Sequence, residues 1–232
     1  MRKCRLPLAL ICLVALDASA LAAQLTRNGE PAQLDVRPAG EHAVRVTMRP
    51  LSFEAALPWS PTLVPGLDSV APALSLREVD ATVERQVGAL TVIVRGDPLT
   101  IEIRDATGAR VQELVFADDG TVAFEVGGAP VLGMGEGGPQ PGQGWRTDHE
   151  IELDRRGRFH EMRPRWQSNA YGSRNPVALL VGTDGWALYV ATPWVQVDLT
   201  EEGHGTFIPW RRPEPPPADA DEDARRAYIR ET

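Results

Sequence analysis

Residues 90–126 decide the fold, and they read LTVIVRGDPLTIEIRDATGARVQELVFADDGTVAFEV. Apolar and polar residues alternate in successive short runs, which is the period-2 pattern of half-buried β-strands. Gly-containing turns separate the runs, and two of them lie at 105–108 and 118–120. Connections this short join antiparallel strands and place glycine where the backbone needs positive φ. The stretch therefore predicts a meander of antiparallel hairpins.

Residues 177–192 repeat this scheme further along the chain. Two apolar runs, at 177–181 and 186–190, flank a turn at 183–185. Because the runs are continuously apolar, they predict central strands that are buried on both faces. No segment before residue 215 has the apolar spacing of a helix. If all these strands lay in one open sheet, an apolar face would be left in water. We therefore predict an all-β, antiparallel β-sandwich rather than a closed barrel.

Residues 1–22 have the features of a secretory signal peptide. Basic residues at 2–5 precede an apolar run at 6–16, and small residues at 18–22 offer a cleavage site. A membrane anchor needs roughly 20 apolar residues, whereas this run is shorter and contains Pro7. We therefore expect an exported protein, periplasmic or extracellular, that is not held by the membrane after cleavage.

Removal of this peptide changes the charge and the cysteine content. The whole chain of 232 residues has 24 basic and 32 acidic side chains, a net charge of -8. The peptide contains three of the basic residues and one acidic residue, which leaves 21 against 31 and a net charge of -10. Both cysteines also leave, so the mature chain forms no disulfide. An acidic chain does not suit a phosphate backbone, and we predict no nucleic-acid partner.

The mature chain divides into a β-sandwich domain at 24–212 and a tail at 213–232. Inside the domain, residues 127–144 are so rich in glycine that they predict a long loop. Long loops in compact domains tend to be functional, and a plain connection between sheets is the alternative. The tail begins with a stiff Pro-rich spacer. It continues into a charged segment that permits a short helix, with an N-cap at Asp219 or Asp221.

The residue types of common active sites lack their usual spacing in this chain. The histidines have no metal-ligand spacing, and no Gly-x-Ser-x-Gly elbow is present. We therefore predict no catalytic residue, no metal site and no cofactor. Residues 166–175 combine aromatic rings with Arg and Asn, a composition that suits carbohydrate, because sugar C–H faces stack on indole. An ordinary loop with packed aromatic rings is the alternative interpretation.

Several of these segments resemble the N-terminal domain of glycoside hydrolase family 31, which comprises α-glucosidases, α-xylosidases and related retaining enzymes. The similar segments are 133–140, 154–157, 162–163 and 176–193. The resemblance implies a galactose mutarotase-like β-sandwich. In that family both catalytic aspartates lie on a following (β/α)8 barrel of about 250 residues, the nucleophile within a Trp-x-Asp-Met segment. The resemblance thus implies an accessory domain that is not catalytic alone.

The resemblance also implies which residues contact a substrate. In the family this domain lends a loop to the outer wall of the active site, where an acidic residue and an arginine touch the sugar beyond the scissile bond. The matching positions are Asp154 with Arg155, followed by Arg163, Trp166 and Tyr171. The implied partners are carbohydrate and a (β/α)8 barrel domain.

Three functions follow as alternatives. The first is an N-terminal accessory domain of a secreted α-glycosidase-like protein, which contributes a loop to the hydrolysis of α-glycosides. The second is a free-standing carbohydrate-binding module that uses Trp166 and Tyr171. The third is a mutarotase-type epimerase, whose chemistry needs a His acid and a carboxylate base at the anomeric centre. His149 and His160 are the candidates for that acid.

Overall fold

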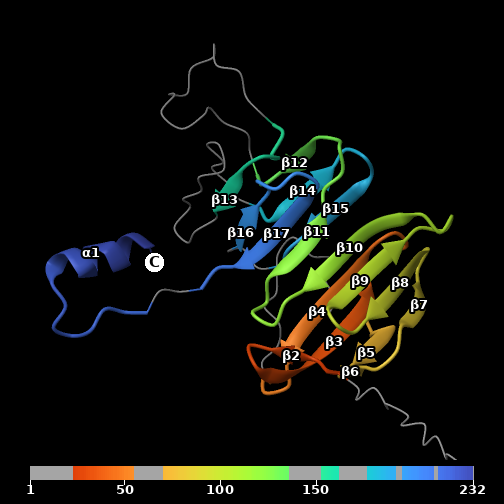
Figure 1. Cartoon of the computed structure of the whole chain (residues 1–232), viewed down its shortest axis with the longest axis horizontal. Helices are drawn as coiled ribbons and strands as arrows, with labels where there is room; N and C mark the ends of the chain where they lie inside the picture. The colour runs from red at the N-terminus through yellow and green to blue at the C-terminus, as the bar shows by residue number, and fades with distance from the viewer. Residues whose placement is uncertain are drawn as a thin grey trace, which may run out of the picture.

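The computed structural model describes residues 23–54, 70–135, 153–161, 177–191, 195–211 and 214–231. These residues form β-strands and one helix, α1 (Glu222–Glu231). No helix among them is long and apolar enough to cross a membrane. In Figure 1 a large sheet lies in front of smaller sheets, and the described strands form no closed barrel. The prediction of an all-β, antiparallel sandwich is therefore confirmed.

One layer of the sandwich is an eight-stranded antiparallel sheet. Its strands, in spatial order, are β13 (Phe159–Glu161), β16 (Val195–Asp198), β17 (His204–Pro209), β11 (Val122–Glu125), β10 (Arg110–Phe116), β9 (Leu99–Arg104), β8 (Leu90–Arg95) and β7 (Val83–Val87). Strands β8 to β11 are the meander predicted from residues 90–126, each paired with the next. Neighbours in the sequence are therefore neighbours in this part of the sheet.

The predicted turns of the meander form around an aspartate and a glycine. Asp105 Oδ1 accepts hydrogen bonds from the backbone N of Thr107 at 2.8 Å and of Ala109 at 3.0 Å. Gly108 closes this turn with φ of 85°, and Gly120 closes the next one with φ of 87°. Residues that have a Cβ rarely adopt a positive φ, which explains why glycine occupies both positions.

Strand β10 contains an irregularity, because its pairing with β9 shifts register between Arg110 and Gln112. The Gln112 side chain is buried at this point. Its amide donates to the Glu125 carbonyl at 3.0 Å and accepts from the Glu125 N–H at 2.9 Å. A strand backbone makes the same two bonds to a partner. The side chain thus extends the pairing of β10 with β11 beyond Leu114 and Phe124.

The other layer consists of two smaller sheets. The first has the order β2 (Thr26–Arg27), β3 (Glu30–Pro38), β4 (Val44–Pro50), and β5 (Leu74–Leu76) also pairs with β3. The second has the order β12 (Val131–Gly133), β14 (Leu179–Gly182), β15 (Trp186–Tyr189). A separate two-stranded sheet pairs β1 (Ala23–Gln24) with β6 (Glu78–Val79).

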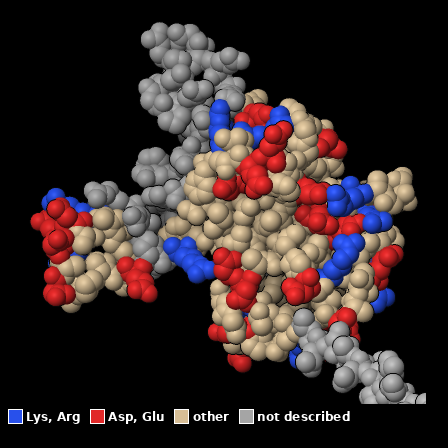
Figure 2. Space-filling view, in the orientation of Figure 1, with Lys and Arg blue, Asp and Glu red and all other residues tan. Residues whose placement is uncertain are grey.

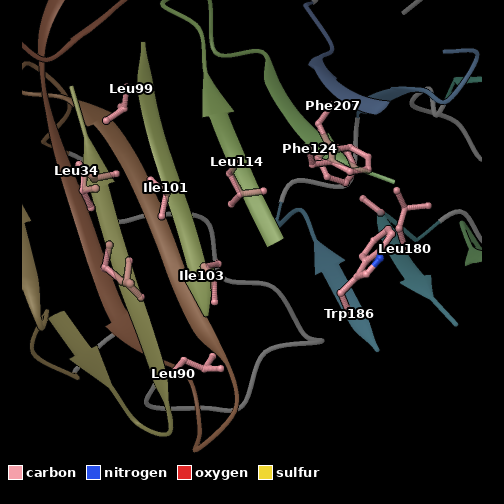
Figure 3. Packing of buried hydrophobic residues seen from close by; sticks show 14 of the residues in the cluster. Leu34, Leu90, Leu99, Ile101, Ile103, Leu114, Phe124, Leu180, Trp186 and Phe207 are labelled. Atoms are coloured by element: carbon pink, nitrogen blue, oxygen red, sulfur yellow. The ribbon is translucent and has the colours of Figure 1, made fainter. Parts of the chain in front are cut away.

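The hydrophobic core lies between the layers. Leu34 of β3 and Ile101 of β9 are fully buried, and Figure 3 shows Leu34 lying against the β8–β9 part of the large sheet. At the other end of the core, Phe124 of β11 packs edge-on against Trp186 of β15, with ring centroids 6.2 Å apart. Fully burying one such side chain contributes about 1.5–3 kcal/mol. Trp186 is a core residue, as the sequence indicates.

The prediction that 177–181 and 186–190 form central strands is confirmed for β14, which lies between β12 and β15, and is wrong for β15; neither strand is buried on both faces. Strand β15 is the edge of its sheet, and its residues alternate, so that Trp186 is buried while Ala187 and Tyr189 are exposed. Strand β14 also alternates between half-buried and buried residues. The reason is that, among the described residues, this small sheet packs on the large sheet with one face only. A continuous apolar run does not reveal how many faces are covered.

The predicted helix in the tail forms as α1. Asp221 Oδ1 accepts a hydrogen bond from the Ala224 N–H at 2.7 Å, so Asp221 is the N-cap. Glu222 and Arg226 form an ion pair of 2.6 Å one turn apart. In Figure 1 the helix lies apart from the sheets.

Candidate functional site

Residues 153–161 bridge the two layers of the sandwich. At the start of this segment, the Arg155 N–H donates to the Val131 carbonyl of β12 at 2.8 Å. A few residues later the chain bonds to the large sheet, since Leu199 N–H donates to the Arg158 carbonyl at 2.9 Å and β13 then pairs with β16. The segment therefore fixes the end of the small β12-β14-β15 sheet against the edge of the large sheet.

The prediction that residues 127–144 form one long loop is wrong at 131–133, because these residues pair with β14 as strand β12, while residues 136–144 lie outside the described residues. The Gly-x-Gly segment at the end of β12 has an unusual backbone. Gly133, Met134 and Gly135 all have positive φ, at 115°, 65° and 93°. Met134 is fully buried, and its N–H donates to the Leu179 carbonyl at 2.9 Å. A Cβ at Gly133 would lie 2.1 Å from that same carbonyl oxygen. Only glycine fits this close approach, so the backbone here is tightly specified. We call residues 133–135 the loop base.

Arg155 supports this base from inside the protein. Its side chain is only 1% exposed, and its Nε donates to the Gly133 carbonyl at 2.9 Å. The Arg155 carbonyl in turn accepts a hydrogen bond from Nε2 of the buried His160 at 2.8 Å. Burial lowers the pKa of His160, because it disfavours the charged ring. Arg155 thus holds the loop base, and its buried position gives no support to the expected contact with a substrate.

Asp154 and Arg156 lie on the surface next to this base, each with a side chain 32% exposed. Arg156 Nη2 lies 2.8 Å from Asp154 Oδ2, and Asp154 Oδ1 accepts from the Val131 N–H at 3.1 Å. The Arg156 guanidinium, with the backbone N–H groups that also bond to it, holds the pKa of Asp154 down at about 2. The carboxylate is therefore ionised at neutral pH. We call these two side chains the Asp154–Arg156 pair.

Arg156 keeps donors available for a ligand. Its Nε and Nη2 bond to Asp154, and its Nη1 donates to the Gly128 carbonyl at 2.6 Å. A guanidinium has five N–H groups in a planar fork, so two of them remain after these contacts. The hydrogen-bonded Asp154 raises the pKa of Arg156, and Asp184 in the β14–β15 turn adds a second negative charge that acts in the same direction. The neighbours of Arg156 thus hold its guanidinium in place while the side chain stays about one-third exposed.

The sequence predicts part of this arrangement. Asp154 is among the expected contacts but is paired there with Arg155, and Arg156 and Asp184 are not among the expected site residues. The signal was present in the order Asp-Arg-Arg, since residues two apart in an extended segment lie on the same side. The other expected contacts, Arg163, Trp166 and Tyr171, lie outside the described residues, as does His149. Within the described ranges no group of three His, Cys, Asp or Glu side chains is arranged to hold a metal ion.

Comparison with known proteins gives a likeness in fold. No protein-family model matches the chain, and no curated protein matches its sequence. One similar solved structure is a GH31 dextranase of Flavobacterium johnsoniae, a mutant in complex with isomaltotriose. The two share 12% sequence identity with a TM-score of 0.55, over 76% of this chain and 22% of the dextranase chain. The described β-sandwich thus has the fold of part of a GH31 enzyme.

Proposed function

We propose that this chain is the N-terminal accessory domain of an exported α-glycosidase-like protein. The observation that carries the proposal is the fold shared with about a fifth of a GH31 dextranase, 22% of its chain. The segments that resemble family 31 in sequence, above all the Gly-x-Gly segment at 133–135, agree with it. The domain would contribute a substrate-contacting loop, and hydrolysis would take place on a (β/α)8 barrel outside these 232 residues.

The loop base supports a binding role for this end of the sandwich. Buried Arg155, buried Met134 and the glycines fix the point where the loop leaves β12. The Asp154–Arg156 pair lies beside that point and is about one-third exposed. A planar guanidinium held by a carboxylate donates to sugar hydroxyls with little loss of side-chain entropy, since its orientation is already fixed. Arg156 is therefore the described residue that we assign to substrate contact, with Asp154 positioning it.

Titration of the purified chain with isomaltotriose, followed by calorimetry, tests the binding role. We expect weak, saturable binding that Arg156→Gln reduces about tenfold, the effect of losing one charge-assisted hydrogen bond. Arg85→Gln is the matched control, because Arg85 is an exposed strand arginine on β7, outside this site. Equal binding by the original chain and Arg156→Gln would contradict the role of Arg156. Strong binding that depends on Trp166 and Tyr171 would favour the free-standing carbohydrate-binding module.

Two further measurements test the accessory and export parts of the proposal. The chain alone should not hydrolyse p-nitrophenyl α-glucoside, and hydrolysis by the purified chain would overturn the assignment as accessory. The coding sequence that follows Thr232 in the gene should specify a barrel with a Trp-x-Asp-Met segment. N-terminal sequencing of the protein recovered outside the cytoplasm should begin near residue 23. Recovery of the chain with its first 22 residues intact would contradict the signal peptide.

A further inference from the structure

The turn between β2 and β3 exposes an Asn-Gly dipeptide. Asn28 and Gly29 both have positive φ, at 52° and 76°, and both are exposed. This is the conformation of a two-residue hairpin turn, for which Asn-Gly is the preferred sequence. Strand β2 is only two residues long and pairs with β3 at two positions. Few backbone bonds of the hairpin therefore resist a local opening of the turn.

The hairpin turn lies against the turn between β10 and β11. The Asn28 N–H donates to the Asp118 carbonyl at 2.7 Å, and the Gly29 N–H donates to Asp118 Oδ2 at 2.9 Å. The two turns belong to different layers of the sandwich, and in Figure 1 β2 lies just below the β10–β11 turn. The second bond places a carboxylate against the backbone nitrogen of the Asn-Gly peptide bond.

An Asn-Gly peptide bond is open to a rearrangement that needs only water, and asparagine is for this reason a thermolabile residue. The Gly29 nitrogen loses its proton to a base and bonds to Cγ of Asn28, and the side-chain nitrogen takes up a proton and leaves as ammonia. Water then opens the resulting succinimide ring at one of its two carbonyl carbons. The product is aspartate or isoaspartate, so that asparagine and water together give the acid and ammonia.

We propose that Asn28 is a site of deamidation and that Asp118 is the base for this reaction. A general base must lie within about 2.6–3.2 Å of the atom that gives up the proton, and Asp118 Oδ2 lies 2.9 Å from the Gly29 nitrogen. A Cβ at Gly29 would meet no atom within 4 Å, so the attack is not hindered there. Within the described part of the chain the Asn28 side chain makes no hydrogen bond, which leaves its amide able to turn toward this nitrogen.

The reaction would change the charge balance around the two turns. Two acidic and two basic side chains surround them, Asp118, Asp119, Arg27 and Arg211. Arg211 Nη2 donates to the Asp119 carbonyl at 3.1 Å, and Arg27 Nη2 lies 2.9 Å from where a Cβ of Gly120 would be. Figure 2 shows acidic and basic side chains close together in the lower left part of the sandwich, where Figure 1 has β2 and the β10–β11 turn. Deamidation adds a third negative charge, and isoaspartate also lengthens the backbone of the turn, so both products oppose the contact between the layers.

Mass spectrometry of the peptide that contains residue 28 tests the proposal. The purified chain is incubated at mildly alkaline pH and sampled over time. We expect aspartate and isoaspartate to accumulate at residue 28, seen as the replacement of the amide NH2 by OH. Asp118→Asn should slow this accumulation at least about tenfold, because its amide oxygen accepts the Gly29 hydrogen bond but does not take the proton.

Asp119→Ser is the matched control. It removes one negative charge from the same turn and keeps a side-chain oxygen for the Thr121 N–H, while the carboxylate at Gly29 stays in place. The rate at residue 28 should change by less than about twofold, since an exposed charge without a bond to the reacting atoms has a small effect.

The direction of the change separates a base from a mere structural contact. If Asp118 only held the turn closed, or if Asp118→Asn failed to fold, the loosened turn would reach the cyclic geometry more readily and deamidation would be faster. Three results would overturn the proposal: no deamidation at residue 28 while a free peptide of residues 24–33 deamidates, an Asp118→Asn chain that reacts as fast as the original or faster, or equal slowing by Asp119→Ser. Carbohydrate binding at the Asp154–Arg156 pair has no part in this measurement, so its outcome is independent of the proposed function.

Discussion

Two regions of this sandwich are held together in different ways. In the meander of residues 90–126, each strand pairs with its neighbour in the sequence, and the side-chain contact of longest range within it joins residues 18 apart, Arg95 and Glu113. At the base of the Gly-rich loop the contacts join distant segments. Arg155 reaches Gly133 across 22 residues, and Thr183 reaches Pro130 across 53. The meander is specified locally, whereas the loop base exists only when the whole sandwich is assembled.

The largest effect should come from Gly133→Ala, which tests how tightly the loop base is specified. The new Cβ would lie 2.1 Å from the Leu179 carbonyl oxygen, on a backbone with φ of 115°. We expect the free energy of unfolding in urea to fall by more than about 4 kcal/mol, because backbone must move to relieve the overlap.

Gly108→Ala in the meander is its control. Gly108 also has positive φ, but a Cβ there would meet nothing within 4 Å. The loss should be about 1 kcal/mol, the conformational cost alone. Equal losses for the two glycines would mean that the loop base yields as readily as a hairpin turn.

Arg155→Met should have the next largest effect. The substitution keeps the apolar stem and removes the buried donor that bonds to the Gly133 carbonyl. We expect a loss of about 3 kcal/mol in thermal or urea denaturation, because a buried polar network loses one partner. Arg110→Met, at a half-exposed ion pair of the meander, should cost about 0.5 kcal/mol. If Arg155→Met were as mild as Arg110→Met, the support that Arg155 gives to the loop base would be refuted.

Gln112→Ala tests the meander itself. The buried amide makes both backbone bonds to Glu125 where the pairing of β10 shifts, so its removal leaves a donor and an acceptor without a partner. A loss of about 2 kcal/mol is expected from urea denaturation. Gln86→Ala, at an exposed position of β7, should change stability by about 0.5 kcal/mol or less. A Gln112 variant as stable as the Gln86 variant would show that the strands pair equally well without the side-chain bonds.

The difference between local pairing in the meander and distant contacts at the loop base also explains which parts of the fold the sequence could predict. Strands β8 to β11 and their turns follow from residues a few positions apart, such as Asp105 with Gly108 and the alternation of Val92 and Val94. The faces of β14 and β15 did not follow, because the number of covered faces depends on which distant sheet packs against them. The register shift at Gln112 and the burial of its side chain could not be predicted from the sequence either, since a polar residue near a turn usually points to solvent.

Part of the candidate site could likewise be predicted from the sequence, and part of it depends on how the sandwich packs. The resemblance to family 31 identified Asp154 and the glycines of the loop. The burial of Arg155 and the exposure of Arg156 depend on how the 153–161 segment crosses from β12 to β16, and this crossing joins residues far apart in the chain. Neighbouring arginines with opposite burial cannot be told apart by composition or spacing. Only the packed sandwich separates the arginine that supports the loop from the one that faces solvent.

The smallest effect concerns pH and the Asp154–Arg156 pair. The folded pKa of Asp154 is about 2, below its usual value of 3.8, so the folded state binds this proton less readily than the unfolded state. The stabilisation is therefore complete above pH 3.8 and is lost as the pH falls toward 2. Because the pair is about one-third exposed, we expect about 1 kcal/mol after solvent screening. The difference in unfolding free energy between the original chain and Asp154→Asn should thus be present at pH 5 and vanish near pH 2. Asp80→Asn, at an exposed position away from the loop base, is the matched control and should change the unfolding free energy at pH 5 by about 0.5 kcal/mol or less. A difference for Asp154→Asn that stays constant with pH would show that the hydrogen bonds of Asp154 act without its charge.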